Sequence, residues 1–167
     1  SSSSGSFDIH DFSFETDSIV TNDLNLSLQL ENLSAPRSLP HQTISIRRID
    51  LGAPIENLLV HYQLKQIDPL RLNIEKAQFS FMDGMVSIAP DSIIAENSAD
   101  LLVHVSNFDL KTLFDLMQID GLSGNGHLDG QIPISLSEKL IVIKDGYLTA
   151  KTPGVLHFKS EKAAQYL

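Results

Sequence analysis

Strict alternation of apolar and polar residues is the feature that most constrains the fold of this chain. Residues 24–31 read Leu-Asn-Leu-Ser-Leu-Gln-Leu-Glu. Because successive side chains of a strand point to opposite faces, this segment predicts a β-strand with one apolar and one polar face. The same alternation recurs at 58–64, 70–74, 101–105 and 128–136 and, over shorter stretches, at Phe12 with Phe14 and Ile44 with Ile46.

An Asp-Gly pair at 83–84 predicts a β-hairpin. It separates two apolar-patterned stretches, 79–82 and 85–88. A two-residue type I′ loop at Asp83-Gly84 would pair Met82 with Met85, and the next residues in turn. This register puts four apolar side chains on one face of the sheet, namely Phe79, Phe81, Val86 and Ile88.

A second Asp-Gly pair, Asp145-Gly146, predicts a hairpin near the C-terminal end. Its loop would pair Ile143 with Leu148, and Ile141 with Ala150. Two prolines, Pro54 and Pro133, lie beside strand patterns. Proline cannot donate a ladder hydrogen bond, so we expect sheet edges or bulges at both positions.

One segment has the period of a helix. Apolar residues at 110, 113, 114 and 117 fall at i, i+3, i+4 and i+7, with Asp109 as the N-cap and Gly121 able to end the helix. The glycine-rich run 121–130 that follows does not fit a phosphate loop, because such a loop follows a strand and opens a helix. We expect a turn and a bulged strand start there.

These patterns predict a mainly β chain of 167 residues, a single-domain length. The expected architecture is an antiparallel curved sheet, either an open groove or sandwich-like, with one short helix near residues 109–118 and, as one option, a second helix at the C-terminus. Residues 1–6 read as a flexible leader or a remnant of expression. Residues 7–158 form the β-rich domain, taken as a fragment of a longer groove protein, and residues 159–167 form a truncated helix or tail that Ser160 could cap.

Composition removes several functional classes. The net charge of -9 disfavours nucleic acid, and the absence of cysteine removes thiol nucleophiles and Cys-based metal sites. None of the six histidines forms a metal motif, and the Asp8, His10 and Asp11 cluster is better explained as part of a flexible leader. The sequence therefore predicts no catalytic residue, cofactor or metal, and no enzyme activity.

The C-terminal third carries an ordered set of short motifs: LKTLFDLM (110–117), IDGLSGNGHLDG (119–130), IPI (132–134), KDGYL (144–148) and PGVL (153–156). This order, over roughly residues 100–158, resembles the C-terminal region of YdbH-type proteins in the AsmA-like group of bacterial envelope proteins. That group carries an older label of dicarboxylate transport. The four arginines of this chain, Arg37, Arg47, Arg48 and Arg71, form no clear carboxylate-binding cluster in the sequence to support the label.

The resemblance implies a function in lipid transport. Proteins of this group are anchored in the inner membrane, cross the periplasm and hold phospholipid acyl chains on an apolar β-groove between the two membranes, which maintains the outer membrane. A small outer-membrane lipoprotein would join the C-terminal end by strand addition. The present chain would then be a soluble periplasmic portion, without enzyme chemistry.

The residues expected to contact lipid lie on the apolar phases of the predicted strands. They are Leu26, Leu28, Val60, Tyr62, Leu64, Phe79, Phe81, Val86 and Ile88. Two other classes stay open at this point. One is an extracytoplasmic β-sandwich interaction module, with the same residues in a closed core. The other is an enzyme whose carboxylates or histidines converge in a cleft.

Overall fold

A computed structural model describes residues 3–17, 19–50, 53–117, 121–137 and 140–158. The first strands are β1 (Gly5–Glu15), β2 (Val20–Asn32), β3 (Arg37–Ser38), β4 (Gln42–Asp50), β5 (Pro54–Gln66) and β6 (Arg71–Phe81). They are followed by β7 (Gly84–Ile88), β8 (Ser92–Ala95), β9 (Ser98–Asp109) and the helix α1 (Leu110–Met117). The last are β10 (Leu122–Gly124), β11 (His127–Ser137), β12 (Leu140–Ile143), β13 (Tyr147–Ala150) and β14 (Leu156–Phe158).

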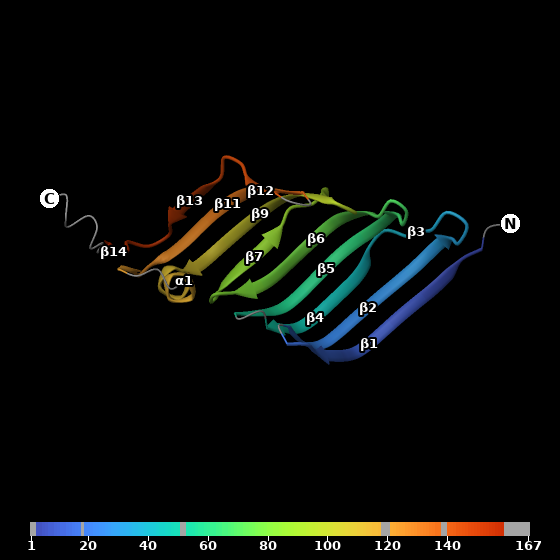
Figure 1. Cartoon of the computed structure of the whole chain (residues 1–167), viewed down its shortest axis with the longest axis horizontal. Helices are drawn as coiled ribbons and strands as arrows, with labels where there is room; N and C mark the ends of the chain where they lie inside the picture. Colours follow the sequence, from blue (N-terminus) through green and yellow to red (C-terminus); the bar gives the residue numbers. More distant parts are fainter. Residues whose placement is uncertain (1–2, 18, 51–52, 118–120, 138–139, 159–167) are drawn as a thin grey trace.

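Twelve strands form one antiparallel sheet, and the predicted mainly β fold with one short helix is confirmed (Figure 1). The sheet runs β1-β2-β4-β5-β6-β7-β9-β11-β12, so almost every strand lies beside its neighbour in sequence. The short strands β3, β8 and β13 pair with this path, and β10 and β14 form a separate two-stranded sheet. The sheet does not close among the described residues: β1 is one edge, and β12 with β13 is the other.

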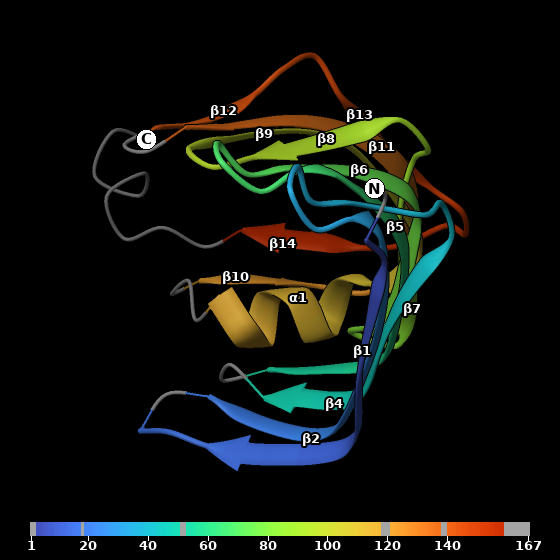
Figure 2. The same ribbon diagram turned by 90° about the vertical axis from the view of Figure 1, so that its right-hand side faces the viewer.

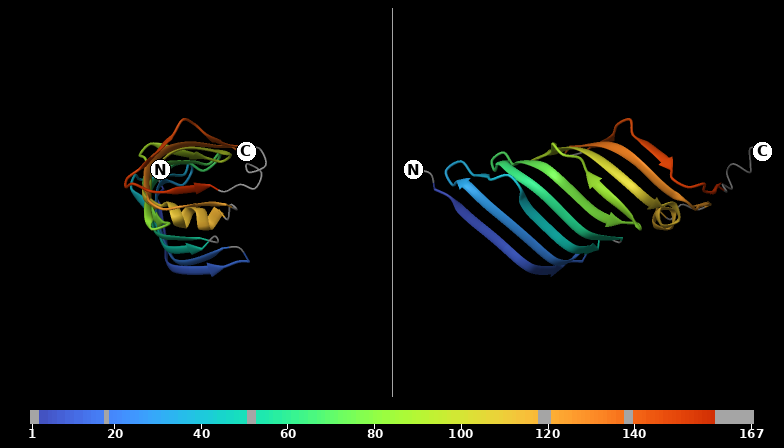
Figure 3. Two further views of the ribbon diagram at one scale, coloured as in Figure 1. Left: turned by 90° about the vertical axis from the view of Figure 1, so that its left-hand side faces the viewer. Right: turned by 180° about the vertical axis from the view of Figure 1, so that it is seen from behind.

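Viewed along the succession of strands, the sheet curls strongly to one side (Figure 2, and Figure 3 from the other end). Bulges explain the curl, because an extra residue bends a strand and increases its twist. Four bulge-region residues have left-handed backbone angles: Asp11 at φ 50°, Asp23 at 55°, Asn57 at 54° and Asn107 at 58°. Asp and Asn tolerate this conformation better than other residues with a Cβ.

Polar side chains hold several of these bulges. The backbone N–H of Asp11 donates to Oδ1 of Asn25 at 3.0 Å, and that of Asp23 donates to Oγ of Ser13 at 3.0 Å. At the far end of the sheet, the N–H of Asn107 donates to Oδ1 of Asp129 at 2.7 Å. Each bond gives a partner to an N–H next to a break in the regular ladder.

The first Asp-Gly hairpin forms with a different register from the one predicted. Its two loop residues are Met82 and Asp83, both with positive φ, and Phe81 pairs with Gly84. Phe79 consequently faces Val86, not Ile88. Moving a two-residue loop by one position shifts every partner by two residues, and a two-residue shift keeps each side chain on its face.

The second Asp-Gly hairpin does not form, and this prediction is wrong. Both β12 and β13 pair with β11, so they make one interrupted edge strand: Ile134 faces Ile143, and Gly130 faces Leu148. The interruption, with Asp145 and Gly146, lies opposite Pro133, whose carbonyl accepts from the N–H of Lys144 at 3.0 Å. Because proline donates no ladder bond, the strand is broken at that point.

The helix α1 lies near the C-terminal end of the sheet, on the side toward which the sheet curls (Figures 1 and 2). As predicted, Asp109 caps it: Oδ1 accepts from the N–H of Lys111 at 3.2 Å, and Oδ2 from the N–H of Thr112 at 3.3 Å. Where β11 pairs with β9, the register shifts between Leu128 and Gly130. The extra residue of this bulge belongs to β9, between Val105 and Phe108, and not to the start of β11 as expected.

The structure can be compared with the expected domain limits at the two ends of the chain. Strand β1 begins at Gly5 and so includes the last two residues of the segment expected to be a leader. Residues 159–167, expected as a helix or tail, lie outside the described residues. Within the described part, no helix is long and apolar enough to cross a membrane.

Candidate functional site

An unbroken row of apolar residues crosses the sheet at right angles to its strands. Directly opposed residues of neighbouring strands share a face. Following the pairing from β1 to β11 gives one apolar residue in each of eight strands. We call this the apolar row: Ile9, Leu26, Ile44, Val60, Ala77, Ile88, Val103 and Ile132.

The opposite face carries a mostly polar row. The pairing from β2 to β13 joins eight residues, of which only Leu59 is aliphatic. This polar row consists of Asn25, Ser45, Leu59, Gln78, Ser87, His104, Gln131 and Tyr147. The sheet is therefore amphipathic as a whole, with one apolar and one polar face over most of its width.

The apolar row lies on the inside of the curl. Side chains on the inside of a curved sheet converge, and those on the outside spread apart. Leu26 and Leu28 of β2 pack against a cluster that includes Tyr62 of β5, although β4 lies between these strands. The Tyr62 hydroxyl also reaches back to donate to the Ser27 carbonyl at 3.4 Å.

All nine residues predicted to contact lipid lie on this one face. Leu26, Val60 and Ile88 belong to the apolar row itself. Flanking positions are held by Leu28, Tyr62, Leu64, Phe79, Phe81 and Val86. The shared face follows from alternation and pairing, while contact with lipid stays a prediction.

The nine residues differ in how much of each side chain is accessible. Tyr62, Leu64 and Val86 are each 5% exposed, so neighbouring side chains already cover them. Burial also raises the pKa of the Tyr62 hydroxyl. Leu26, Val60 and Ile88 are only partly buried. The accessible predicted residues are therefore the partly buried ones, whereas Ala77, in the middle of the apolar row, is only 2% exposed.

Sequence reasoning missed five members of the apolar row: Ile9, Ile44, Ala77, Val103 and Ile132. The alternating pattern places Ile44, Val103 and Ile132 in strands but does not assign them to this face, because it does not give the order of the strands. Ile9 fell beside the expected leader, and Ala77 is too small to mark a strand pattern. The short turns between successive strands were the signal that could have placed them, since such turns favour neighbours in an up-and-down sheet.

Both ends of the apolar face expose large side chains. At the β1 edge, Phe7 is 55% and Phe12 50% exposed, and the Phe12 and Phe14 rings lie 5.9 Å apart. At the opposite edge, Ile143 is 66% and Leu148 52% exposed. The apolar face thus reaches both open edges of the sheet.

Arg48, Asp50 and Glu56 lie together on the apolar phase near the rim of the sheet, where Arg48 pairs with both carboxylates. His61 and His104 lie on the polar phase of their strands, as predicted, with His61 opposite Thr43 and Lys76. His41 contacts Glu75 at 2.8 Å, but its side chain is 80% exposed. Among the described residues, no group of three or more His, Cys, Asp or Glu is arranged to hold a metal ion.

An apolar surface that runs the width of an open sheet, backed by a polar face, fits the binding of long apolar chains. A family model described as YdbH-like, intermembrane phospholipid transport protein YdbH, matches residues 1–167. The chain belongs to the YdbH-like family. The match covers the whole chain, whereas the sequence motifs pointed to its C-terminal third. No curated protein and no solved structure matches the chain.

Membership of the YdbH-like family connects the amphipathic sheet to phospholipid transport between membranes. A phospholipid presents two acyl chains that avoid water and a headgroup that needs it. A one-sided apolar surface can shelter the chains while the headgroup stays hydrated. The apolar row is consequently the candidate lipid-binding site of this YdbH-like chain.

Proposed function

We propose that this chain is a periplasmic portion of a bridge-like phospholipid transport protein, and that acyl chains lie along its apolar row. The single observation that carries the proposal is the continuity of that row across eight strands. An acyl chain can move from strand to strand there without crossing a polar side chain. The step needs no bond-making chemistry, so the proposed protein is not an enzyme.

The wider setting belongs to the same proposal. The whole protein would be anchored in the inner membrane and would contribute to outer-membrane homeostasis. Membership of an intermembrane phospholipid transport family supports this setting. The alternative of a β-sandwich interaction module requires a second sheet over the apolar face. In the described part of the chain, the only second sheet is the two-stranded β10-β14 pair.

A matched pair of variants on β4 tests the proposal. Ile44→Asp places a carboxylate in the apolar row, and Ser45→Asp places the same group on the polar row. Native mass spectrometry after incubation with phospholipid vesicles should find bound lipid on the wild type and on Ser45→Asp. Ile44→Asp should lose most of it. Thermal melting shows whether each variant is folded.

Two results would count against the proposal. One is a folded wild type that takes up no phospholipid from vesicles. The other is a folded Ile44→Asp variant that carries as much lipid as Ser45→Asp, because the row would then be irrelevant to binding.

We further propose that a small outer-membrane lipoprotein extends the sheet at its C-terminal edge. Strands β12 and β13 have no neighbour on their outer side among the described residues, and an open edge is a template for another strand. The exposed Ile143 and Leu148 would continue the apolar face into the added strand. The Lys144 N–H donates to the Pro133 carbonyl on β11, so the N–H of the preceding residue, Ile143, points to the open edge. Ile143→Pro should weaken co-purification of that lipoprotein, while Ser87→Pro in the interior strand β7 should unfold the protein.

A further inference from the structure

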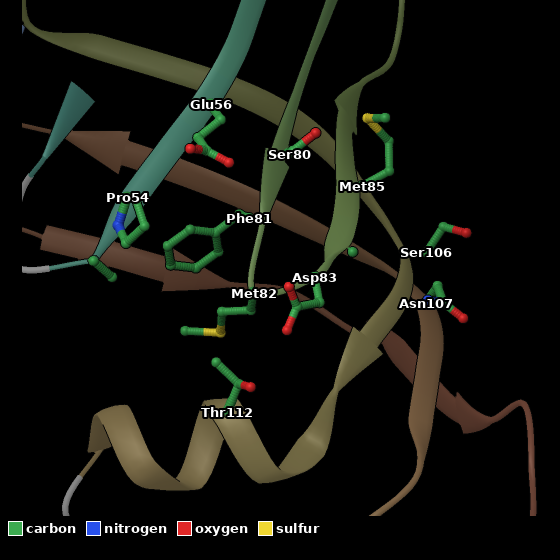
Figure 4. A pocket seen from close by; sticks show the side chains of 12 residues that line it. Pro54, Glu56, Ser80, Phe81, Met82, Asp83, Met85, Ser106, Asn107 and Thr112 are labelled. Carbon is green, nitrogen blue, oxygen red and sulfur yellow. The ribbon is translucent and has the colours of Figure 1, made fainter. Parts of the chain in front are cut away.

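A cavity of about 510 Å³ lies apart from the apolar row, between the start of α1 and the ends of β5, β6, β7 and β9. Its apolar lining includes Pro54, Phe81, Met82 and Met85, and Thr112 of α1 closes one side. Figure 4 shows the Phe81 ring beside Pro54, with the Met82 side chain directed toward Thr112. We call this cavity the rim pocket.

The rim pocket is continuous with the apolar face. Phe81 lies two residues after Phe79 in β6 and therefore points to the same face, where Phe79 is opposite Val86. The Phe81 ring also contacts Phe108 of β9, with ring centroids 6.0 Å apart. An acyl chain on the apolar face can reach the pocket along these aromatic rings.

The rim pocket also communicates with the polar side of the sheet. Ser80 and Met85, which face each other on the opposite phase from Phe81, line it too. Residues of both faces can line one cavity only where the sheet ends. Met85 is 44% exposed, so the pocket reaches solvent. This geometry makes an opening at the rim of the sheet, between the β6-β7 turn and α1.

The lining selects for a hydrocarbon chain over a phosphate. Two methionines and a phenylalanine form a soft, adaptable apolar wall of the kind that accepts flexible ligands. No Lys or Arg is among the described residues that line the pocket, whereas Glu56 and Asp83 are. Arg48 already binds Glu56 at 2.8 Å. An anionic headgroup would be repelled here, while an acyl chain would not.

Residues outside the rim pocket hold α1 in its position. Leu110 and Phe114 point toward β10, since a Cβ built on Gly124 would lie 3.0 Å from Phe114 and 3.4 Å from Leu110. The N-cap at Asp109 holds the first turn. Thr112 therefore faces the pocket because the rest of α1 is anchored elsewhere.

We propose that the rim pocket is a side port that takes one fatty acyl chain of a phospholipid entering or leaving the apolar row sideways. The inference rests on the proposed lipid-carrying function. It adds a site at the edge of the sheet where a phospholipid can enter or leave the apolar face. A lipid would lodge one chain against Phe81 and Met82, with its headgroup in water beyond Met85.

Site-specific photocrosslinking tests the port. The photoreactive residue p-benzoylphenylalanine is placed at Ile88 in the apolar row, at Thr112 in the rim pocket, or at the exposed neighbour Lys111 as a control. Each full-length variant is incubated with phosphatidylethanolamine–phosphatidylglycerol vesicles and irradiated, and lipid adducts are found by mass spectrometry. We expect adducts at Ile88 and Thr112, and at least fivefold fewer at Lys111.

A filling variant supplies the second measurement. With the photoreactive residue at Met82, Thr112→Trp should cut the adduct yield at least fivefold, while the yield from Ile88 in the same background stays unchanged. Adducts at Ile88 without any at Thr112 and Met82 would overturn the side port alone. A lack of adducts at all three positions would overturn the proposed function together with the port.

Discussion

The hydroxyl of Ser38 accepts a 2.8 Å hydrogen bond from the backbone N–H of Leu64. Ser38 is fully buried, and the same hydroxyl donates to the Leu39 carbonyl at 2.7 Å. One side chain thus satisfies a buried amide of β5 and ties the short strand β3 to the sheet. Leu64 itself is only 5% exposed, so water cannot replace this partner.

Ser38→Ala should therefore destabilise the fold by about 1–3 kcal/mol, because the buried Leu64 N–H loses its acceptor. Urea unfolding followed by circular dichroism measures the change. Ser98→Ala, at an exposed position at the start of β9, is the matched control and should change stability by less than about 0.5 kcal/mol. Equal stabilities for the two variants would contradict the assigned role.

Val86 and Met85 lie on opposite faces of β7. Val86 is 5% exposed beside Phe79, whereas Met85 is 44% exposed on the opposite phase. Val86→Asp buries an unpaired carboxylate and should cost several kcal/mol, enough to unfold a marginal domain. Met85→Asp should melt close to the wild type.

Unfolding of Val86→Asp therefore cannot distinguish an open groove from a closed sandwich core. Loss of the fold in Val86→Asp does not require a sandwich core, because neighbours in a single curved sheet already cover this side chain. Partly buried positions such as Ile44 are the informative ones for lipid binding. A Val86→Asp variant as stable as Met85→Asp would show that the inside of the curl is far more open than its exposure indicates.

The strands and their faces could be predicted from the sequence, because burial of one face imposes alternation. The grouping of Phe79, Phe81, Val86 and Ile88 is confirmed although the hairpin register was wrong. The error moved partners by two residues, and only an odd shift exchanges faces. An alternating pattern therefore assigns side chains to a face of the sheet more reliably than it gives the register between strands.

A curved sheet was expected, but the residues that produce the curl and the arrangement of the C-terminal edge could not be predicted. Bulges depend on single residues such as Asp23 and Asn57 adopting positive φ, and these look like ordinary polar positions of a strand. The Asp145-Gly146 pair has ideal hairpin chemistry, yet it forms an interruption because a neighbouring strand, β11, offers a longer partner. Competition between local turns and long-range pairing is invisible in a local pattern.

Asn57 tests the role of the bulges directly. Its side chain is exposed and its φ is 54°, so the residue contributes mainly through its backbone conformation. Asn57→Val should destabilise the protein by about 1–2 kcal/mol, because a β-branched residue is strained in the left-handed region. Asn57→Gly should stay within about 0.5 kcal/mol of the wild type, because Gly adopts positive φ readily.

Chemical denaturation of the two Asn57 variants provides the comparison. A Val variant as stable as the Gly variant would mean that the bulge is not needed for the fold. Lipid loading of the Gly variant should match that of the wild type, since the curl is preserved.

The carboxylate of Asp109 makes stability depend on pH. The hydroxyl of Thr112 donates to its Oδ2 at 2.6 Å, and this bond, with those from the Lys111 and Thr112 amides, lowers the pKa of Asp109 below its ordinary value of 3.8. A carboxyl with a lowered folded pKa stabilises the fold above the unfolded pKa. That contribution is lost as the pH falls through the folded pKa.

We therefore expect Asp109→Ala to cost about 1 kcal/mol near neutral pH, the usual value of an N-cap. Asp109→Asn keeps the capping geometry but cannot titrate, so it should lose less. As the pH falls from about 5 to 3, the stability advantage of the wild type over Asp109→Asn should shrink, because only the wild type takes up a proton there. Urea unfolding at each pH measures this difference. A constant gap between the two proteins over that range would show that the Asp109 carboxylate does not stabilise the start of α1 through its charge.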